Sequence, residues 1–216
     1  TFFIGLVVMV IWFAAGGKVL HMAPIFVLAF CGLLLALYLK PHLWIRLDAY
    51  FHPELYESTK AYHLKNSIIG FANGGFWGMG IGEGNQKLGF TPEPHTDFIF
   101  STMGEELGFV KSSIVLLMYG WIIGLGYITA MKCANPFGKL LVVGCTSAIG
   151  LQTIINVAVV TGCIPTTGIP LPFISYGGSS LVVCMAMVGI IASVAKETFG
   201  VEEIPIRKQK HAAART

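Results

Sequence analysis

Residues 140–195 read LLVVGCTSAIGLQTIINVAVVTGCIPTTGIPLPFISYGGSSLVVCMAMVGIIASVA and contain no Asp, Glu, Lys or Arg. A helix needs about 20 apolar residues to cross a bilayer, so this run is too long for one span. A stretch rich in Gly and Pro divides it. The pattern predicts transmembrane helices over about 140–160 and 179–195, joined by an irregular connection at 161–178, which we call the Pro/Gly loop.

Three further uncharged runs, 1–17, 22–39 and 112–131, approach the same length. The chain is 55% hydrophobic and only 12% charged, far from the usage of a soluble domain. We therefore predict an all-α polytopic membrane protein with about five transmembrane helices, the first two forming a hairpin. Because the chain opens on Thr1 inside an apolar run, we expect a fragment of a longer protein.

Five alternating spans place the turns at 16–21 and 132–139 and the tail 196–216 on one side. That side carries Lys18, Lys132, Lys139, Lys196, Arg207, Lys208, Lys210 and Arg215. By the positive-inside rule it is cytoplasmic. The long loop 40–111 and the Pro/Gly loop therefore share the outer face.

The middle of the long loop, residues 66–82, is free of charge but contains six glycines. A lipid-exposed helix of that composition would be poor. We expect a short helix from about Tyr62 to Ala72, followed by Gly-rich backbone in the interface or in a protein-lined cavity. The alternative is a sixth span, which would invert everything after it.

Several classes of site are disfavoured. The net charge of +3 and the lack of a basic stripe argue against nucleic-acid binding. The five cysteines form no Cys-x-x-Cys pair, and we interpret them as small hydrophobic residues. The spacing of His, Cys and acidic residues predicts no protein metal site.

Ionisable residues concentrate between Thr91 and Gly108, which includes Glu93, His95, Asp97, Glu105 and Glu106. Asp97 precedes an apolar run that would partly desolvate it, so it is a candidate general base. Alternatively, Thr96 or Asp97 caps a helix that starts at Phe98.

Other polar residues near the site also have two interpretations. Thr102 to Glu105 fits a capping box before a helix that begins near Leu107, and Glu106 would suit a helix N-terminus. Lys87 and His95 could pair with an anionic substrate or extend from the interface. Gln152 and Asn156 share one helix face, where interhelical hydrogen bonding is favoured over substrate contact.

The Pro/Gly loop has three prolines and four glycines among residues 161–180, which indicates a shaped and rigid segment. It leads into the last helix, whose N-terminal amides could receive a phosphate. A site-forming role is favoured over a plain connection.

These strings together resemble the SEDS family (shape, elongation, division and sporulation), and within it the FtsW-type division proteins. The resemblance rests on PEPHTDFIF at 92–100, GEELG at 104–108, QKL at 86–88 and GIPLPFISYGGSS at 168–180. It implies a ten-helix membrane protein, of which this chain is the second half, helices six to ten, with a large extracellular loop that contains short helices.

The resemblance also implies an activity: a peptidoglycan glycosyltransferase that polymerises lipid II outside the cytoplasmic membrane during cell division. Asp97 matches the family's essential acid and would deprotonate the acceptor sugar. A divalent cation, Mg²⁺ or Mn²⁺, could neutralise the leaving diphosphate. The candidate substrate-binding residues are Lys87, Glu93, His95, Thr96, Glu105, Glu106, Ser175, Tyr176, Gly177, Gly178 and Ser179.

Expected partners are lipid II, a class B penicillin-binding protein transpeptidase and other proteins of the division septum. Two alternatives remain open, a lipid II flippase and a non-catalytic scaffold. A transporter would be expected to carry ionisable groups near the bilayer midplane, and none of the five predicted spans shows one.

Overall fold

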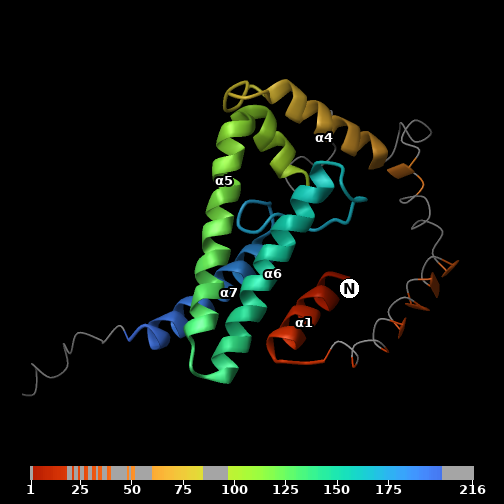
Figure 1. Cartoon of the computed structure of the whole chain (residues 1–216). Coiled ribbons are helices and arrows are strands. Elements are labelled where there is room, and N and C mark those ends of the chain that lie inside the picture. The colour runs from red at the N-terminus through yellow and green to blue at the C-terminus, as the bar shows by residue number, and fades with distance from the viewer. Residues whose placement is uncertain are drawn as a thin grey trace, which may run out of the picture.

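The chain folds as an all-helical protein in the computed structural model of its 216 residues (Figure 1). The structure describes residues 2–18, 60–84 and 97–200, together with single positions between 21 and 51. The helices in these residues are α1 (Phe2–Ala14), α4 (Lys60–Gly74), α5 (Ile99–Lys132), α6 (Pro136–Val160) and α7 (Gly178–Thr198). The predicted all-α class is confirmed. Half of the positions of the predicted span 22–39 lie outside the described residues, and so does the tail from residue 201.

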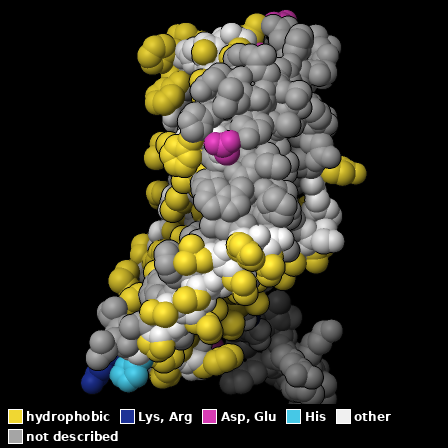
Figure 2. Space-filling view, turned by 90° about the vertical axis from the view of Figure 1, so that its right-hand side faces the viewer, with side chains coloured by type: hydrophobic (Ala, Val, Ile, Leu, Met, Phe, Trp, Pro, Cys, Tyr) yellow, Lys and Arg dark blue, Asp and Glu magenta, His cyan; other side chains and the backbone are white. Residues whose placement is uncertain are grey.

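Three of the helices in the described residues, α5, α6 and α7, are long and apolar enough to cross a membrane. Helix α1 is equally apolar but shorter. Hydrophobic side chains make up most of the described surface on the face shown in Figure 2, as lipid contact requires. The chain is a polytopic membrane protein.

The basic residues of the short turns and of the end of α7 lie near one end of the bundle. The turn after α1, the connection from α5 to α6 and the end of α7 all lie at the lower end in Figure 1. Lys132 at the end of α5 places its Nζ 5.2 Å from the ring centroid of Phe199, just after α7. The grouping of Lys18, Lys132 and Lys196 used to assign the cytoplasmic side therefore corresponds to one physical end.

Helix α5 begins at Ile99 and is broken at Gly108 (φ 77°, ψ 178°), so its second segment starts close to the predicted start at residue 112 and its first segment was not predicted. A straight helix of its 34 residues would be about 51 Å long, well beyond a hydrocarbon core of roughly 30 Å. The break resolves the mismatch, because the first segment runs up to the apex and the second runs down through the bundle (Figure 1). The polar residues before 112 are helical because they pack against α4 and the turn that follows it.

We call the contact between residues 74–84 and residues 104–110 the α4–α5 junction. The backbone N–H groups of Met79 and Gly80 donate to the carbonyls of Glu105 and Glu106, at 3.0 and 3.1 Å. In the opposite direction, Phe109 N donates to the carbonyl of Gly75 at 2.9 Å. The Gly-rich turn thus replaces the backbone hydrogen bonds that the helix loses at its break.

The junction decides between the two interpretations of residues 66–82. Helix α4 covers the short helix expected from Tyr62 to Ala72, and that prediction is confirmed. It is not one of the described helices that are long and apolar enough to span a membrane, so the alternative of a sixth span is wrong. Gly78, after this helix, is required by close backbone packing, since a Cβ there would lie 2.2 Å from the carbonyl oxygen of Glu106.

Two apolar clusters hold the helices together at different levels. One surrounds Phe100, Tyr119, Val160 and Leu171, and joins α5 and α6 to the Pro/Gly loop. The other surrounds Ala130, Val142 and Val143, with side chains from α1 and α7 packed against it. Phe98, the residue after Asp97, packs against the first cluster.

Candidate functional site

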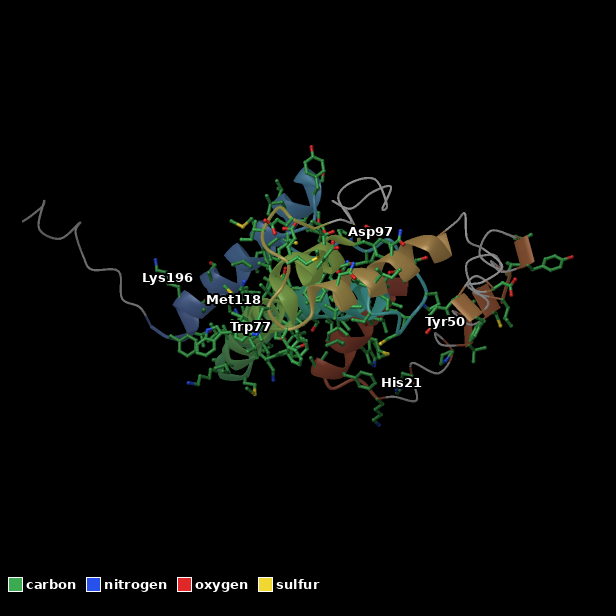
Figure 3. The ribbon with its side chains drawn as sticks, turned by 90° about the horizontal axis from the view of Figure 1, so that it is seen from above. His21, Tyr50, Trp77, Asp97, Met118 and Lys196 are labelled. Carbon is green, nitrogen blue, oxygen red and sulfur yellow. The ribbon has the colours of Figure 1, made fainter. Side chains whose placement is uncertain are left out.

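Asp97 lies in the turn before α5, where it is partly exposed, and Figure 3 shows it well separated from Trp77 in the junction. Its backbone carbonyl accepts a hydrogen bond from Asn156 Nδ2 at 2.8 Å. Its Oδ2 lies 3.3 Å from the position that a Cβ on Gly168 would occupy. The N-cap of α5 is Phe98, so the alternative that Thr96 or Asp97 occupies the N-cap position is wrong.

The Pro/Gly loop turns back into the bundle after α6 ends. Gln152 Nε2 donates to the carbonyl of Pro170 at 2.9 Å, and Asn156 Nδ2 donates to that of Ile169 at 2.8 Å. Gln152 lies eight residues before Val160, so the loop descends by about 12 Å along α6. Irregular backbone at such a depth is tolerated where protein surrounds it.

Further side chains hold the loop from α5 and from within. Tyr119 of α5 donates its hydroxyl hydrogen bond to the carbonyl of Pro172. Phe173, the next residue, has φ 66°, an uncommon backbone conformation for a bulky residue. The loop is therefore held in one shape by donors from two helices. Gln152 and Asn156 were expected to form hydrogen bonds between helices. Instead, both donate to backbone carbonyls of the loop.

The residues from Ser175 to Ser179 do not all face the same way. Ser175 is buried, and its Oγ accepts from the backbone N–H of Leu171 at 2.7 Å. Tyr176 is 84% exposed. Gly177 occupies the N-cap of α7, and Gly178 and Ser179 are exposed in its first turn. Ser175 thus shapes the loop, and the other four residues present a surface at the start of α7.

Glu105 and Glu106 are buried, with exposed fractions of 0% and 8%. Both lie inside the first segment of α5, immediately before its break, so the predicted capping box and the predicted N-terminal position are wrong. Within the junction, their carboxylates lie close to Gly84: a Cβ on Gly84 would lie 3.0 Å from Glu105 Oε2 and 3.2 Å from Glu106 Oε1. The second segment of α5 begins directly after the break at Gly108, close to the helix start expected near Leu107, but Glu105 and Glu106 lie in the first segment and do not cap it.

The structure therefore separates the predicted site residues into two places. Asp97 meets the Pro/Gly loop, whereas Glu105 lies eight residues further along α5, about 12 Å away along the axis. Lys87, Glu93, His95 and Thr96 lie outside the described residues.

Comparisons with known proteins agree with this architecture. Residues 1–199 match the FtsW, RodA and SpoVE model, described as cell cycle protein. The chain belongs to the FtsW/RodA/SpoVE family. It is 37% identical over 194 residues to "Probable peptidoglycan glycosyltransferase FtsW" of Geobacter sp. (strain M18), covering 90% of this chain and 53% of the relative. The resemblance to SEDS proteins is thereby confirmed.

Other members of the FtsW/RodA/SpoVE family give the same picture. "Stage V sporulation protein E" of Bacillus subtilis (strain 168) is 35% identical over 184 residues, covering 85% of this chain and 50% of that protein. A solved chain from "Structural coordination of polymerization and crosslinking by a peptidoglycan synthase complex" is 27% identical with a TM-score of 0.74, covering 94% of this chain and 56% of its own length. The chain spans about half the length of the curated relatives it matches.

The predicted divalent cation receives no ligand cluster from the described residues of this FtsW/RodA/SpoVE chain. Nowhere in 2–18, 60–84, 97–200 or the single described positions do three His, Cys, Asp or Glu side chains come together in a way that could hold a metal.

The described part of this family member also contains site residues that our sequence analysis did not assign to the site. Tyr119 and Gly168 received no role, yet one holds the Pro/Gly loop and the other contacts the region of Asp97. A polar side chain in an otherwise apolar span could have pointed to Tyr119, because such side chains usually have a hydrogen-bond partner inside the protein. Tyr119 and Asn156 both fit that description.

Proposed function

We propose that the whole protein is a peptidoglycan glycosyltransferase that polymerises lipid II at the outer face of the bacterial cytoplasmic membrane during division. Membership of the FtsW/RodA/SpoVE family supports this, together with one observation. The carboxylate of Asp97 is placed against Gly168 of a rigid loop, at a partly exposed position away from the basic end of the bundle.

The proposed chemistry needs a general base beside a sugar hydroxyl. Asp97 would remove the proton from the acceptor's 4-hydroxyl as that oxygen attacks the anomeric carbon of the donor sugar. The bond from the anomeric carbon to the lipid diphosphate then breaks, and the diphosphate leaves with the bonding electrons. Such a base contributes about 10²- to 10⁴-fold to a rate. A divalent cation held by the substrate's diphosphate remains part of the proposal, without a described protein site.

Partners also belong to this proposal. The solved relative comes from a peptidoglycan synthase complex. We infer that this protein works with a class B penicillin-binding protein transpeptidase and other division proteins at the septum.

The test is lipid II polymerisation by the full-length protein and its transpeptidase, reconstituted in liposomes. We expect Asp97→Asn to lower the rate by about 100-fold or more while folding and partner binding are retained. The matched control is Glu83→Gln, which neutralises an exposed carboxylate in the junction and should leave the rate unchanged. Retained polymerisation by Asp97→Asn would contradict the role of the base. Wild-type protein that makes no polymer would favour transport or scaffolding.

A further inference from the structure

We propose that Asn156, supported by Gln152, is a positioning residue that holds the backbone of Asp97 in register with Gly168 of the Pro/Gly loop. The effect on catalysis rests on the proposed function. The structural claim, that one buried amide joins two segments far apart in sequence, is tested separately.

Asn156 uses both of its amide donors for this connection. Its Nδ2 donates at 2.8 Å to Asp97 O and at 2.8 Å to Ile169 O. The residue is only 1% exposed, so these donors are withdrawn from water. Its Oδ1 has no hydrogen-bond partner within the described residues, which means that the donors alone account for the amide's fixed orientation.

The Pro/Gly loop needs such donors because its prolines reduce the number of backbone N–H groups that it can supply itself. Pro165, Pro170 and Pro172 lack an N–H, yet their segment carries carbonyls into the protein interior. Gln152 satisfies the carbonyl of Pro170 and Tyr119 that of Pro172. Unlike these two, the Asn156 amide also reaches Asp97. It therefore couples the loop to the proposed base, whereas Gln152 and Tyr119 hold the loop alone.

The consequence for the reaction is geometric. Asp97 Oδ2 already lies close to Gly168, so a small shift of either backbone changes the space available to the acceptor hydroxyl. A misplacement of about 1 Å in a reacting group can cost about 100-fold in rate. The loss falls on kcat, because Asn156 is buried and leaves the substrate-binding surface unchanged.

The variants are Asn156→Leu, which keeps similar size and removes both donors, and Gln152→Leu, which removes only the bond to Pro170. The matched control is Thr153→Val. Thr153 is buried on the same helix, but its hydroxyl donates to the carbonyl of Ile149 within α6. Asn156→Ser, which keeps one donor, provides the measurement if the Leu variant does not fold.

Hydrogen exchange by mass spectrometry, on the full-length protein with its partner, reads the connection directly. We expect Asn156→Leu to speed exchange at least about tenfold in peptides over 97–100 and 166–175, with α7 unchanged, and Gln152→Leu to affect only the loop peptide. Thr153→Val should match the wild type in both peptides. Unchanged exchange at 97–100 in Asn156→Leu, or in Asn156→Ser, would overturn the connection even if the protein made no polymer.

Polymerisation kinetics test whether Asn156 positions Asp97 for catalysis. We expect kcat to fall about 100-fold in Asn156→Leu and clearly less in Gln152→Leu, with KM for lipid II within about threefold of the wild type. Faster exchange with a normal kcat would overturn the positioning role and leave the proposed glycosyltransferase intact. A rise in KM alone would also overturn it, because it would assign Asn156 to substrate binding.

Discussion

The α4–α5 junction and the Pro/Gly loop solve the same problem in different ways. Each brings irregular backbone into a membrane protein, where unpaired N–H and C=O groups are costly. At the junction, backbone groups pair with backbone groups. The N–H groups of Met79 and Gly80 donate to carbonyls of α5, and the N–H of Phe109 donates to the carbonyl of Gly75. In the loop, side chains of Tyr119, Gln152 and Asn156 supply the donors.

The difference tells us which substitutions each region tolerates. Backbone pairing requires close approach, so the junction depends on residues without a Cβ and makes little demand on other side chains. Side-chain pairing depends on particular polar groups, and it leaves the loop's surface free for chemistry. We therefore expect the junction to serve stability and the loop to serve the site.

The largest effect is expected from Gly108→Ala, which breaks the junction. Gly108 has φ 77°, and a Cβ there would lie 2.2 Å from the backbone nitrogen of Gly78. Strain and clash together should cost about 3 kcal/mol or more of unfolding free energy, measured by denaturation in detergent. The control is Gly120→Ala in the same helix, where nothing lies within 4 Å, and which should be neutral or stabilising. Equal stability of both variants would show that the break can be rearranged at little cost.

A smaller loss of stability, with a clear loss of activity, is expected from Gly168→Ala. Its φ of 73° costs an alanine about 1–2 kcal/mol, and the added Cβ comes to 3.3 Å from Asp97 Oδ2. Gly189→Ala in α7 is the control, because nothing lies within 4 Å of a Cβ at that position. Thermal stability and polymerisation should be measured on both. Normal polymerisation by Gly168→Ala would show that this approach does not constrain the site.

The smallest effect is expected from Trp77→Ala. Trp77 belongs to the junction but its side chain is 75% exposed, and only its backbone takes part in the packing. Its truncation should change the unfolding free energy in detergent by less than about 0.5 kcal/mol. Ser175→Ala provides the contrast in the loop, since it leaves the buried N–H of Leu171 without its acceptor at a cost of about 1–3 kcal/mol. A larger loss for Trp77→Ala than for Ser175→Ala would reverse the comparison.

Much of the fold was predictable because hydrophobic runs and charge asymmetry are local properties of the chain. Helices α6 and α7 cover the predicted ranges 140–160 and 179–195, and the short helix α4 was expected. The predicted span 112–131 corresponds to the second segment of α5, which begins after Gly108, whereas the helical segment that starts at Ile99 was missed. The reason is physical: Glu105 and Glu106 argue for a solvated loop in sequence, and only burial under Gly84 keeps them in a helix.

The sequence by itself determined that the protein is an all-helical membrane protein, that the short turns and the tail on one predicted side are rich in basic residues, and that Asp97 stands out among its acids. Those conclusions depend on composition and on the length of uncharged runs, which are local properties of the sequence. Tertiary structure decided that Asp97 meets Gly168 and that Asn156 connects them, while Glu105 and Glu106 pack elsewhere. Hydrogen bonds between segments that are 59 residues apart leave no periodic signal, because any amide in an apolar helix looks the same until its partner is known.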